Sequence, residues 1–314
     1  MNITIIGAGA VGGYFGAKFI EHGLNVNFLI RTKRAEQITK QGLIIKTNTN
    51  LTNIKTPRIF TNSKDIADVD LVIVAVKNYH LDAELMKNLI ELTNKGAYIL
   101  PLMNGVEHYK VLSEKLGDEK VLGGTCKISV TMDDDGYIHC IGELKEIYFG
   151  ALFPTQRNFC ERFEELMKDC SIKVIRSENI MRTIWEKFSF IVAYSGVTST
   201  SRLNIGQLIN CESTKKVFSD VLNEMMCLSR SYGVNLEKDF IEKTIRWCGR
   251  LPSEVTSSMH FDLTNGRKLE IESIQGSAIN LARRKEIELP TIKTLYALLK
   301  PFENGVPQHV YALD

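Results

Sequence analysis

The sequence predicts an α/β fold in which an N-terminal parallel-sheet domain (residues 1–176) precedes an all-α domain (residues 177–314). Two observations predict it. In the first half, short apolar strands alternate with segments of helical period, which is typical of a parallel sheet covered by helices. Beyond about residue 177 the strand patterns end, and helical period dominates in residues 180–194, 213–232 and 269–285.

The chain opens with an apolar strand, residues 3–6, that runs directly into Gly7-Ala8-Gly9-Ala10-Val11-Gly12. A segment of helical pattern follows to about residue 22. A G-x-G-x-x-G sequence between a strand and a helix predicts a Rossmann-type dinucleotide-binding domain. Gly7 permits a tight turn, Gly9 lets the backbone approach a pyrophosphate, and Gly12 lets helix and strand pack closely. The helix N-terminus offers N–H groups to the anion.

The second predicted strand, residues 24–30, leads into Arg31-Thr32-Lys33-Arg34. In NAD-binding domains an Asp or Glu near this position holds the ribose 2′-hydroxyl. Three cations and a hydroxyl suit a 2′-phosphate instead. We therefore expect NADPH/NADP as the cofactor, with Arg31 as a contact; the alternative is a solvated, basic start of a helix.

Two further predicted strands, residues 70–76 and 97–103, lead into Lys77 and Asn104. In open α/β sheets, ligands bind beyond the carboxyl ends of the strands. We expect Lys77 and Asn104 to line the cofactor crevice. The alternatives are a surface lysine and an asparagine that forms a turn before Gly105.

Residues 122–150 have β-like patterns around Asp133-Asp134-Asp135-Gly136, which predicts a hairpin turn because its spacing matches no calcium-binding loop. The strands expected here are residues 125–132, 137–141 and 146–149. A helix over residues 158–168 should then lead to a strand, residues 172–175, that closes the sheet.

Composition excludes several classes of function. The net charge is +2 without a long basic run, which argues against a nucleic-acid-binding protein. The seven cysteines form no C-x-x-C pair, which predicts reduced thiols in a cytosolic protein, and no His/Cys cluster has metal-ligand spacing. There is no room for a signal peptide before the first strand, and no apolar run reaches about 20 residues. We expect a cytoplasmic protein with no metal, nucleic-acid or membrane partner.

Lys187 is the candidate proton donor of the second half. It lies in an apolar helical segment beside Trp185 and Phe188. A lysine there either extends its flexible stem to water or, if desolvated, becomes a usable proton donor. Ser195 lies two turns further along the same face. Glu270 borders an apolar helical stripe, where exposed and buried placements are equally expected.

Together these segments resemble the ketopantoate reductase (2-dehydropantoate 2-reductase) family. The segments that carry the resemblance are Gly7–Gly13, Val74–Lys77, Met103–Glu107, Trp185–Lys187, Ser257–Met259, Asp262 and Glu270–Gly276. The resemblance spans nearly the whole chain. It implies NADPH-dependent reduction of a 2-oxo acid to a 2-hydroxy acid, with 2-dehydropantoate, an intermediate of pantothenate biosynthesis, as the expected substrate.

The resemblance also implies residue roles. Lys187 would be the general acid that protonates the carbonyl oxygen, and Glu270 would orient the substrate by accepting a hydrogen bond from its hydroxyl. Asn104 and Lys77 would hold the nicotinamide end. The expected substrate contacts are Asn104, Ser195 and Ser258. A homodimer formed through the helical domain is expected as well.

The chain departs from the family where asparagine is typical. The positions concerned are Ile191, Ser195, Ile205 and Val255. Isoleucine and valine side chains form no hydrogen bonds, so substrate binding must differ at these places. One alternative is therefore a paralogue that reduces a different 2-oxo acid or a ketone. Another is a non-catalytic NADPH-binding sensor, against which the presence of both Lys187 and Glu270 argues.

Overall fold

The computed structural model describes residues 1–305, and its chain divides into two compact units. The sheet unit comprises residues 1–103 and 108–183, and the helical unit comprises residues 104–107 together with the chain from Ile184 onward. The short segment 104–107 thus packs with the helices rather than with the sheet that precedes it. This division determines which predicted site residues come together.

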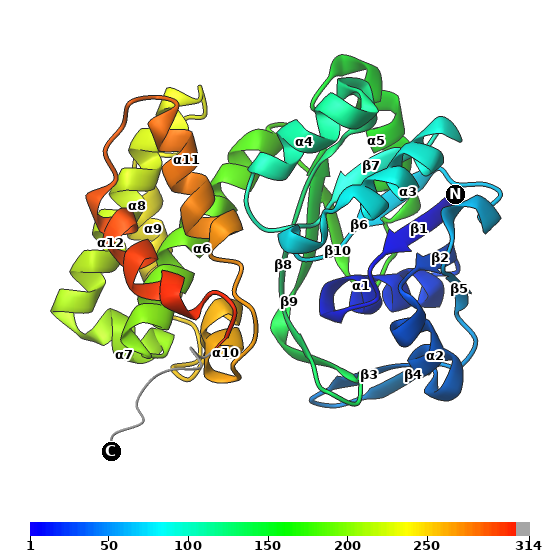
Figure 1. The fold of residues 1–314 in the computed structure, drawn as a ribbon, viewed down its shortest axis with the longest axis horizontal. Coiled ribbons are helices and arrows are strands. Elements are labelled where there is room, and N and C mark those ends of the chain that lie inside the picture. Colours follow the sequence, from blue (N-terminus) through cyan, green and yellow to red (C-terminus); the bar gives the residue numbers. More distant parts are fainter. Residues whose placement is uncertain (306–314) are drawn as a thin grey trace. The chain divides into compact units, whose positions relative to one another are not determined.

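The first sheet of the sheet unit is entirely parallel, with strand order β5-β2-β1-β6-β7 (Figure 1). Its strands are β1 (Asn2–Ile6), β2 (Asn25–Leu29), β5 (Arg58–Phe60), β6 (Leu71–Val74) and β7 (Tyr98–Pro101). Every residue of β6 is buried, as expected for a central strand covered on both faces. This sheet confirms the predicted parallel α/β architecture.

Five α-helices belong wholly or mainly to the sheet unit. They are α1 (Ala10–Glu21), α2 (Thr32–Gln41), α3 (Ala83–Asn94), α4 (Glu107–Leu116) and α5 (Arg157–Leu166). Single-turn 3₁₀ helices link them at η1 (Ser63–Asp65), η2 (Asn78–His80), η3 (Asp118–Lys120) and η4 (Pro154–Gln156). The apolar side of α5 buries Phe159 and Phe163, whose rings pack against each other and extend the core.

A second sheet contains parallel and antiparallel strands. Its strands are β3 (Leu43–Thr47), β4 (Leu51–Ile54), β8 (Gly123–Met132), β9 (Ile138–Gly150) and β10 (Lys173–Arg176). β8 and β9 form the predicted hairpin, and its turn closes with a bond from the Gly136 N–H to the Asp133 carbonyl. The expected separate strand 146–149 is wrong, because these residues continue β9. The strand expected at 172–175 closes this second sheet, where β10 pairs with β9.

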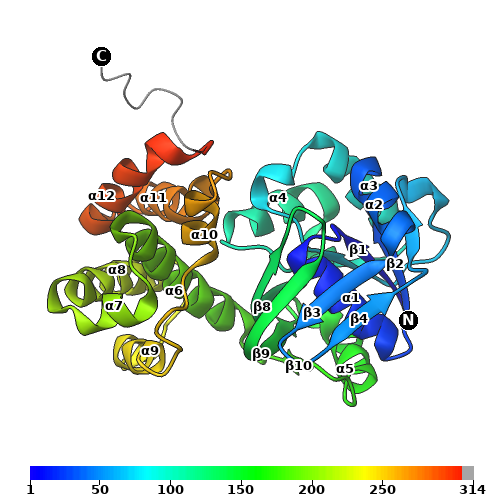
Figure 2. The same ribbon diagram turned by 90° about the horizontal axis from the view of Figure 1, so that it is seen from below.

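The described residues of the helical unit form helices and connecting loops, with no strand. The helices are α6 (Ile180–Ser201, whose first turn belongs to the sheet unit), α7 (Ile205–Asn210), α8 (Glu212–Ser231), α9 (Phe240–Cys248), α10 (Ser258–Thr264), η5 (Glu272–Gly276), α11 (Ser277–Arg283), α12 (Pro290–Leu299) and η6 (Lys300–Phe302). α8 packs against α7, α9, α11 and α12 (Figure 2). Helices α6 and α8 confirm two predicted helices. The helix predicted over 269–285 is wrong at its start, because helical structure begins after Glu270 with a π-helical turn, η5.

Among residues 1–305, no helix combines the length and apolar character needed to span a bilayer.

Candidate functional site

The glycine-rich loop connects β1 to α1. Two of its glycines are required for the packing of the protein, whether or not a ligand is bound. Gly7 has φ +95°, and a Cβ there would lie 2.7 Å from Val76 Cγ1. A Cβ on Gly12 would lie 2.0 Å from the Gly7 carbonyl oxygen. Real Cβ atoms do not approach backbone atoms so closely, so any side chain at Gly12 would push α1 away from the loop. Gly12 therefore maintains the close packing of α1 against the loop and β1, and Gly7 lets the turn lie against the chain that follows β6.

Gly9 is different, because the protein leaves the space around it open. A Cβ on Gly9 would meet no atom within 4 Å. Gly9 is also the N-cap residue of α1, with no side chain capping the helix and no acidic residue in its first turn. The loop residues Ala8, Ala10 and Val11 carry only small apolar side chains. A bare helix N-terminus beside an open backbone fits the pyrophosphate of a dinucleotide.

The basic segment after β2 divides into an exposed and an enclosed arginine. Arg31 precedes α2; its side chain is 67% exposed and lies 3.4 Å from Asp82 Oδ2. Arg34 instead turns inward, where its Nε donates to the Ala8 carbonyl at 2.9 Å, and desolvation lowers its pKa. The backbone N–H of Leu85 and, more weakly, Arg31 lower the pKa of Asp82. Arg31 is thus the exposed arginine of the two. Arg34 stabilises the glycine-rich loop through its hydrogen bond to the Ala8 carbonyl, a role that sequence reasoning missed.

Lys77 follows β6 by three residues and is half-buried. It occupies the N-cap position of η2, where its carbonyl oxygen accepts the His80 N–H at 2.8 Å. The backbone of Lys77 is therefore fixed at the carboxyl end of the parallel sheet, the edge at which ligands of such sheets bind.

The helical unit brings together Asn104 and Glu270, which are 166 residues apart in sequence. Asn104 Nδ2 donates to Glu270 Oε2 at 3.3 Å. Glu270 is buried, with only 8% of its surface exposed. Gly105, with φ +84°, permits this approach, since a Cβ there would lie 2.4 Å from the Ser273 carbonyl oxygen. Two predicted site residues thus form one partly buried amide–carboxylate pair, in which the carboxylate is the buried partner.

Lys187 lies half-buried on α6, between fully buried aromatic neighbours. Trp185 stacks on Tyr232 with ring centroids 5.6 Å apart and meets Phe188 edge-on at 5.7 Å. These contacts pack the two aromatic neighbours of Lys187 into the interior of the helical unit. The role of Lys187 as a proton donor stays a prediction.

The two predicted serine contacts differ in exposure. Ser195 is buried, and its hydroxyl donates to the Ile191 carbonyl and accepts from Gln275 Nε2 at 3.1 Å. Ser258 is exposed at the first residue of α10, behind Ser257, whose side chain caps the helix by accepting the His260 N–H. Ser258 is therefore accessible to a small molecule, whereas the Ser195 hydroxyl is engaged within the protein.

Two of the positions that depart from the family pattern contact each other. Ile205 is completely buried, and its N–H donates to the Val255 carbonyl at 2.9 Å. The Gly206 N–H likewise donates to the Ser253 carbonyl at 3.0 Å. The start of α7 is thus joined to the segment before α10 by two backbone hydrogen bonds.

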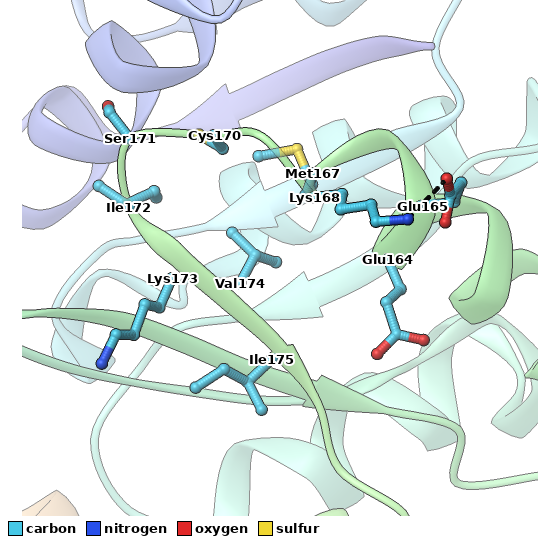
Figure 3. A pocket seen from close by; sticks show the side chains of 10 residues that line it. All are labelled: Glu164, Glu165, Met167, Lys168, Cys170, Ser171, Ile172, Lys173, Val174 and Ile175. Carbon is cyan, nitrogen blue, oxygen red and sulfur yellow. Dashed lines mark ion pairs between the residues drawn. The ribbon is translucent and has the colours of Figure 1, made fainter.

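Within residues 1–305, no group of three or more His, Cys, Asp or Glu side chains has the geometry to hold a metal ion. A surface hollow of about 530 Å³ lies between the end of α5 and β10 (Figure 3). Its lining residues fall between 164 and 175 and include an ion pair, Lys168 with Glu165 at 3.6 Å. None of the predicted site residues lines this hollow, so it is separate from the candidate site.

Comparison with known proteins identifies one family over both units. The family model "Ketopantoate reductase PanE/ApbA" matches residues 3–153, and the model of that family's C-terminal part matches residues 179–303. The chain is 30% identical to an uncharacterised oxidoreductase, YkpB, of Bacillus subtilis over 96% of this chain and 99% of the relative. It is 25% identical to a 2-dehydropantoate 2-reductase of a Nostoc species, over 95% and 93% of the two chains.

Among solved structures, a ternary complex of D-mandelate dehydrogenase with NADH and anilino(oxo)acetate has a similar fold. The TM-score is 0.86 at 21% identity, covering 96% of this chain and 98% of that one. At this identity the likeness concerns the fold alone.

Proposed function

Because the chain belongs to the ketopantoate reductase PanE/ApbA family of oxidoreductases, we propose that it reduces a 2-oxo acid to a 2-hydroxy acid with NADPH. The proposed acid is 2-dehydropantoate, whose reduction gives pantoate for pantothenate biosynthesis. The observation that carries the proposal is the hydrogen bond from Asn104 to the buried carboxylate of Glu270. It joins two of the residues expected at the substrate within the unit that also contains Lys187.

The glycine-rich loop supports a dinucleotide cofactor. The open space at Gly9 and the uncapped N-terminus of α1 suit its pyrophosphate. The similar fold of a dehydrogenase solved with NADH supports a nicotinamide dinucleotide, and the exposed Arg31 favours NADPH. When bound, the reduced nicotinamide supplies the hydride. Lys77 and Asn104 would hold its nicotinamide end.

Hydride addition to a carbonyl carbon leaves negative charge on the oxygen. The Lys187 ammonium would stabilise this charge and then donate its proton to the oxygen. Glu270 would accept a hydrogen bond from the substrate hydroxyl, with its carboxylate oriented by the amide of Asn104. Ser258, exposed at the start of α10, would add a hydrogen bond to the substrate. The contact expected from Ser195 stays a prediction.

The proposal assigns cofactor binding to residues 1–176, and substrate binding and dimerisation to residues 177–314, with Asn104 joining the substrate site from the first range. The protein would act as a homodimer in the cytoplasm. The mass of the particle in solution, measured by light scattering, tests the dimer.

A paralogue with another substrate is the second candidate function. The engaged hydroxyl of Ser195 and the backbone-bonded Ile205 and Val255 offer few hydrogen bonds to a hydroxylated acid. A hydrogen bond to a charged group contributes about 1.5–3 kcal/mol, so losing several would weaken binding strongly. These residues favour a more apolar 2-oxo acid or a ketone.

Oxidation of NADPH in the presence of ketopantoate, beside a panel of simple 2-oxo acids and ketones, tests both candidates. Efficient turnover of ketopantoate would establish the first. Turnover of another acid with ketopantoate ignored would establish the paralogue. NADPH binding without turnover of any compound would contradict both and favour the sensor.

Arg31 gives a direct prediction about the cofactor. We expect Arg31→Ala to raise the Kd for NADPH by about 10- to 100-fold and to leave the Kd for NADH nearly unchanged. The reason is that the guanidinium is 67% exposed and its ion pair with Asp82 is long, at 3.4 Å, so it is available to a 2′-phosphate. Fluorescence titration measures both constants, with Lys40→Ala, which replaces an exposed lysine in the last turn of α2, as the control. An equal loss for NADH and NADPH would contradict a contact with the 2′-phosphate.

A further inference from the structure

A π-helical turn, η5 (Glu272–Gly276), lies between Glu270 and α11 in the helical unit. The Gly276 N–H donates to the Ile271 carbonyl at 2.9 Å, five residues back instead of four. Such turns are rare and usually occur as one-residue insertions within helices, frequently at functional sites. One added residue rotates the preceding chain by about 100° and shifts it by about 1.5 Å. The turn therefore determines the direction in which Glu270 faces.

Gln275 anchors this turn to α6. Its side chain is completely buried, and its Nε2 donates to the Val192 carbonyl at 3.0 Å and to Ser195 Oγ at 3.1 Å. The Ser195 hydroxyl donates a hydrogen bond to the Ile191 carbonyl, which leaves the oxygen lone pairs of Ser195 available to Gln275. A Cβ on Gly196 would lie only 3.1 Å from Gln275 Nε2. The surface of α6 thus has both the acceptors and the space that this amide needs.

The π-helical turn also contacts Glu270 and the residue that follows Asn104. The Glu270 carbonyl accepts the Ile274 N–H at 3.1 Å and the Ser273 hydroxyl at 3.0 Å. The Ser273 carbonyl in turn lies against Gly105, the residue after Asn104. A displacement of the turn would therefore move Glu270 and the backbone beside Asn104 together.

We propose that Gln275 is a positioning residue, which fixes the π-helical turn on α6 and thereby holds Glu270 and Asn104 in the geometry that the substrate requires. The effect of Gln275 on turnover rests on the proposed function. Its effect on the positions of Glu270 and Asn104 rests on the hydrogen bonds described above. Displacements of about 1 Å at a reacting centre can cost about 100-fold in rate, so a residue that touches no substrate can control turnover.

Gln275→Met tests this assignment, because methionine has nearly the same volume but no N–H donor. We expect kcat to fall about 10- to 100-fold, the Kd for NADPH to stay unchanged, and amide hydrogen exchange to accelerate in residues 104–107 and 270–276. The matched control is Thr244→Val, which removes another buried side-chain-to-backbone hydrogen bond of the same unit, from Thr244 to the Phe240 carbonyl, at nearly constant volume. The control should leave kcat and exchange at residues 104–107 unchanged.

A double-mutant cycle separates positioning from general destabilisation. If Gln275 acts through Glu270, then Gln275→Met should lower kcat no further in a Glu270→Gln background. Independent, multiplying losses would overturn the proposal, as would unchanged exchange at residues 104–107. If the unsubstituted protein reduces none of the tested compounds, the proposed function fails, and the exchange measurement alone decides whether Gln275 positions the pair.

Discussion

Lys187→Ala is expected to lower kcat by about 10²- to 10⁴-fold while the Kd for NADPH stays within about twofold of its original value. The side chain lies on α6 of the helical unit, whereas the glycine-rich loop and Arg31 belong to the sheet unit. Loss of a proton donor should therefore affect chemistry without affecting cofactor binding. Steady-state kinetics and a fluorescence titration of NADPH measure the two effects separately.

Two further variants sharpen this prediction. Lys187→Arg retains a positive charge, but arginine does not release its proton in proteins, so it should restore charge stabilisation without proton transfer. Lys216→Ala, which removes a 73% exposed lysine of α8 paired with Asp220, should leave kcat unchanged. Full turnover by Lys187→Ala would contradict the assignment of Lys187 as the general acid, and so would a parallel loss of NADPH affinity.

The sequence predicts those parts of the fold whose signals are local. The glycine-rich loop is recognisable because its strand, turn and helix are adjacent in the chain. The fully apolar β6 is recognisable because burial on both faces leaves no polar positions. Strands β3 to β5 escaped prediction, since β4 alternates exposed with half-buried residues and β5 has only three residues. The sheet that receives β10 depends on pairing with distant β9, which no local pattern encodes.

The same distinction applies to the candidate site. The sequence identifies Asn104 and Glu270 separately, by position after a strand and by resemblance, but their hydrogen bond across 166 residues appears only in the folded chain. Helical spacing places Ser195 on the same helix face as Lys187. No spacing rule reveals that the Gln275 amide donates a hydrogen bond to the Ser195 hydroxyl. The π-helical turn has no periodic signature either. The sequence therefore predicts a continuous helix over 269–285 and does not single out Gln275.

The glycines of the first loop give the second large prediction. Gly9 is expected to make room for the cofactor, whereas Gly12 makes room for the Gly7 carbonyl of the protein. We expect Gly9→Ala to leave thermal stability unchanged and to weaken NADPH binding by about 100-fold or more. Gly9 has φ −77°, which alanine adopts without strain, and an added methyl group would meet no protein atom within 4 Å. The methyl group would instead occupy the space of the pyrophosphate and cost its backbone hydrogen bonds, each contributing about 1.5–3 kcal/mol.

Gly12→Ala should have the opposite signature. Its methyl carbon would lie 2.0 Å from the Gly7 carbonyl oxygen, so α1 or the loop must move. We expect the free energy of unfolding to fall by about 3 kcal/mol, near the upper end of the cost of overpacking, and Tm to fall by about 6–12 °C. Thermal unfolding without cofactor measures this loss, which Gly9→Ala should not show.

Thermal unfolding with and without NADPH distinguishes the two roles in a single experiment. A ligand that binds only the folded state raises Tm in proportion to the logarithm of its concentration over Kd. NADPH should therefore stabilise the unsubstituted protein and fail to stabilise Gly9→Ala at the same concentration. A Gly9→Ala protein that is still stabilised by NADPH would show that the pyrophosphate does not lie over Gly9. A Gly9→Ala protein that unfolds as early as Gly12→Ala would show that Gly9, too, is required by the fold and not by the cofactor.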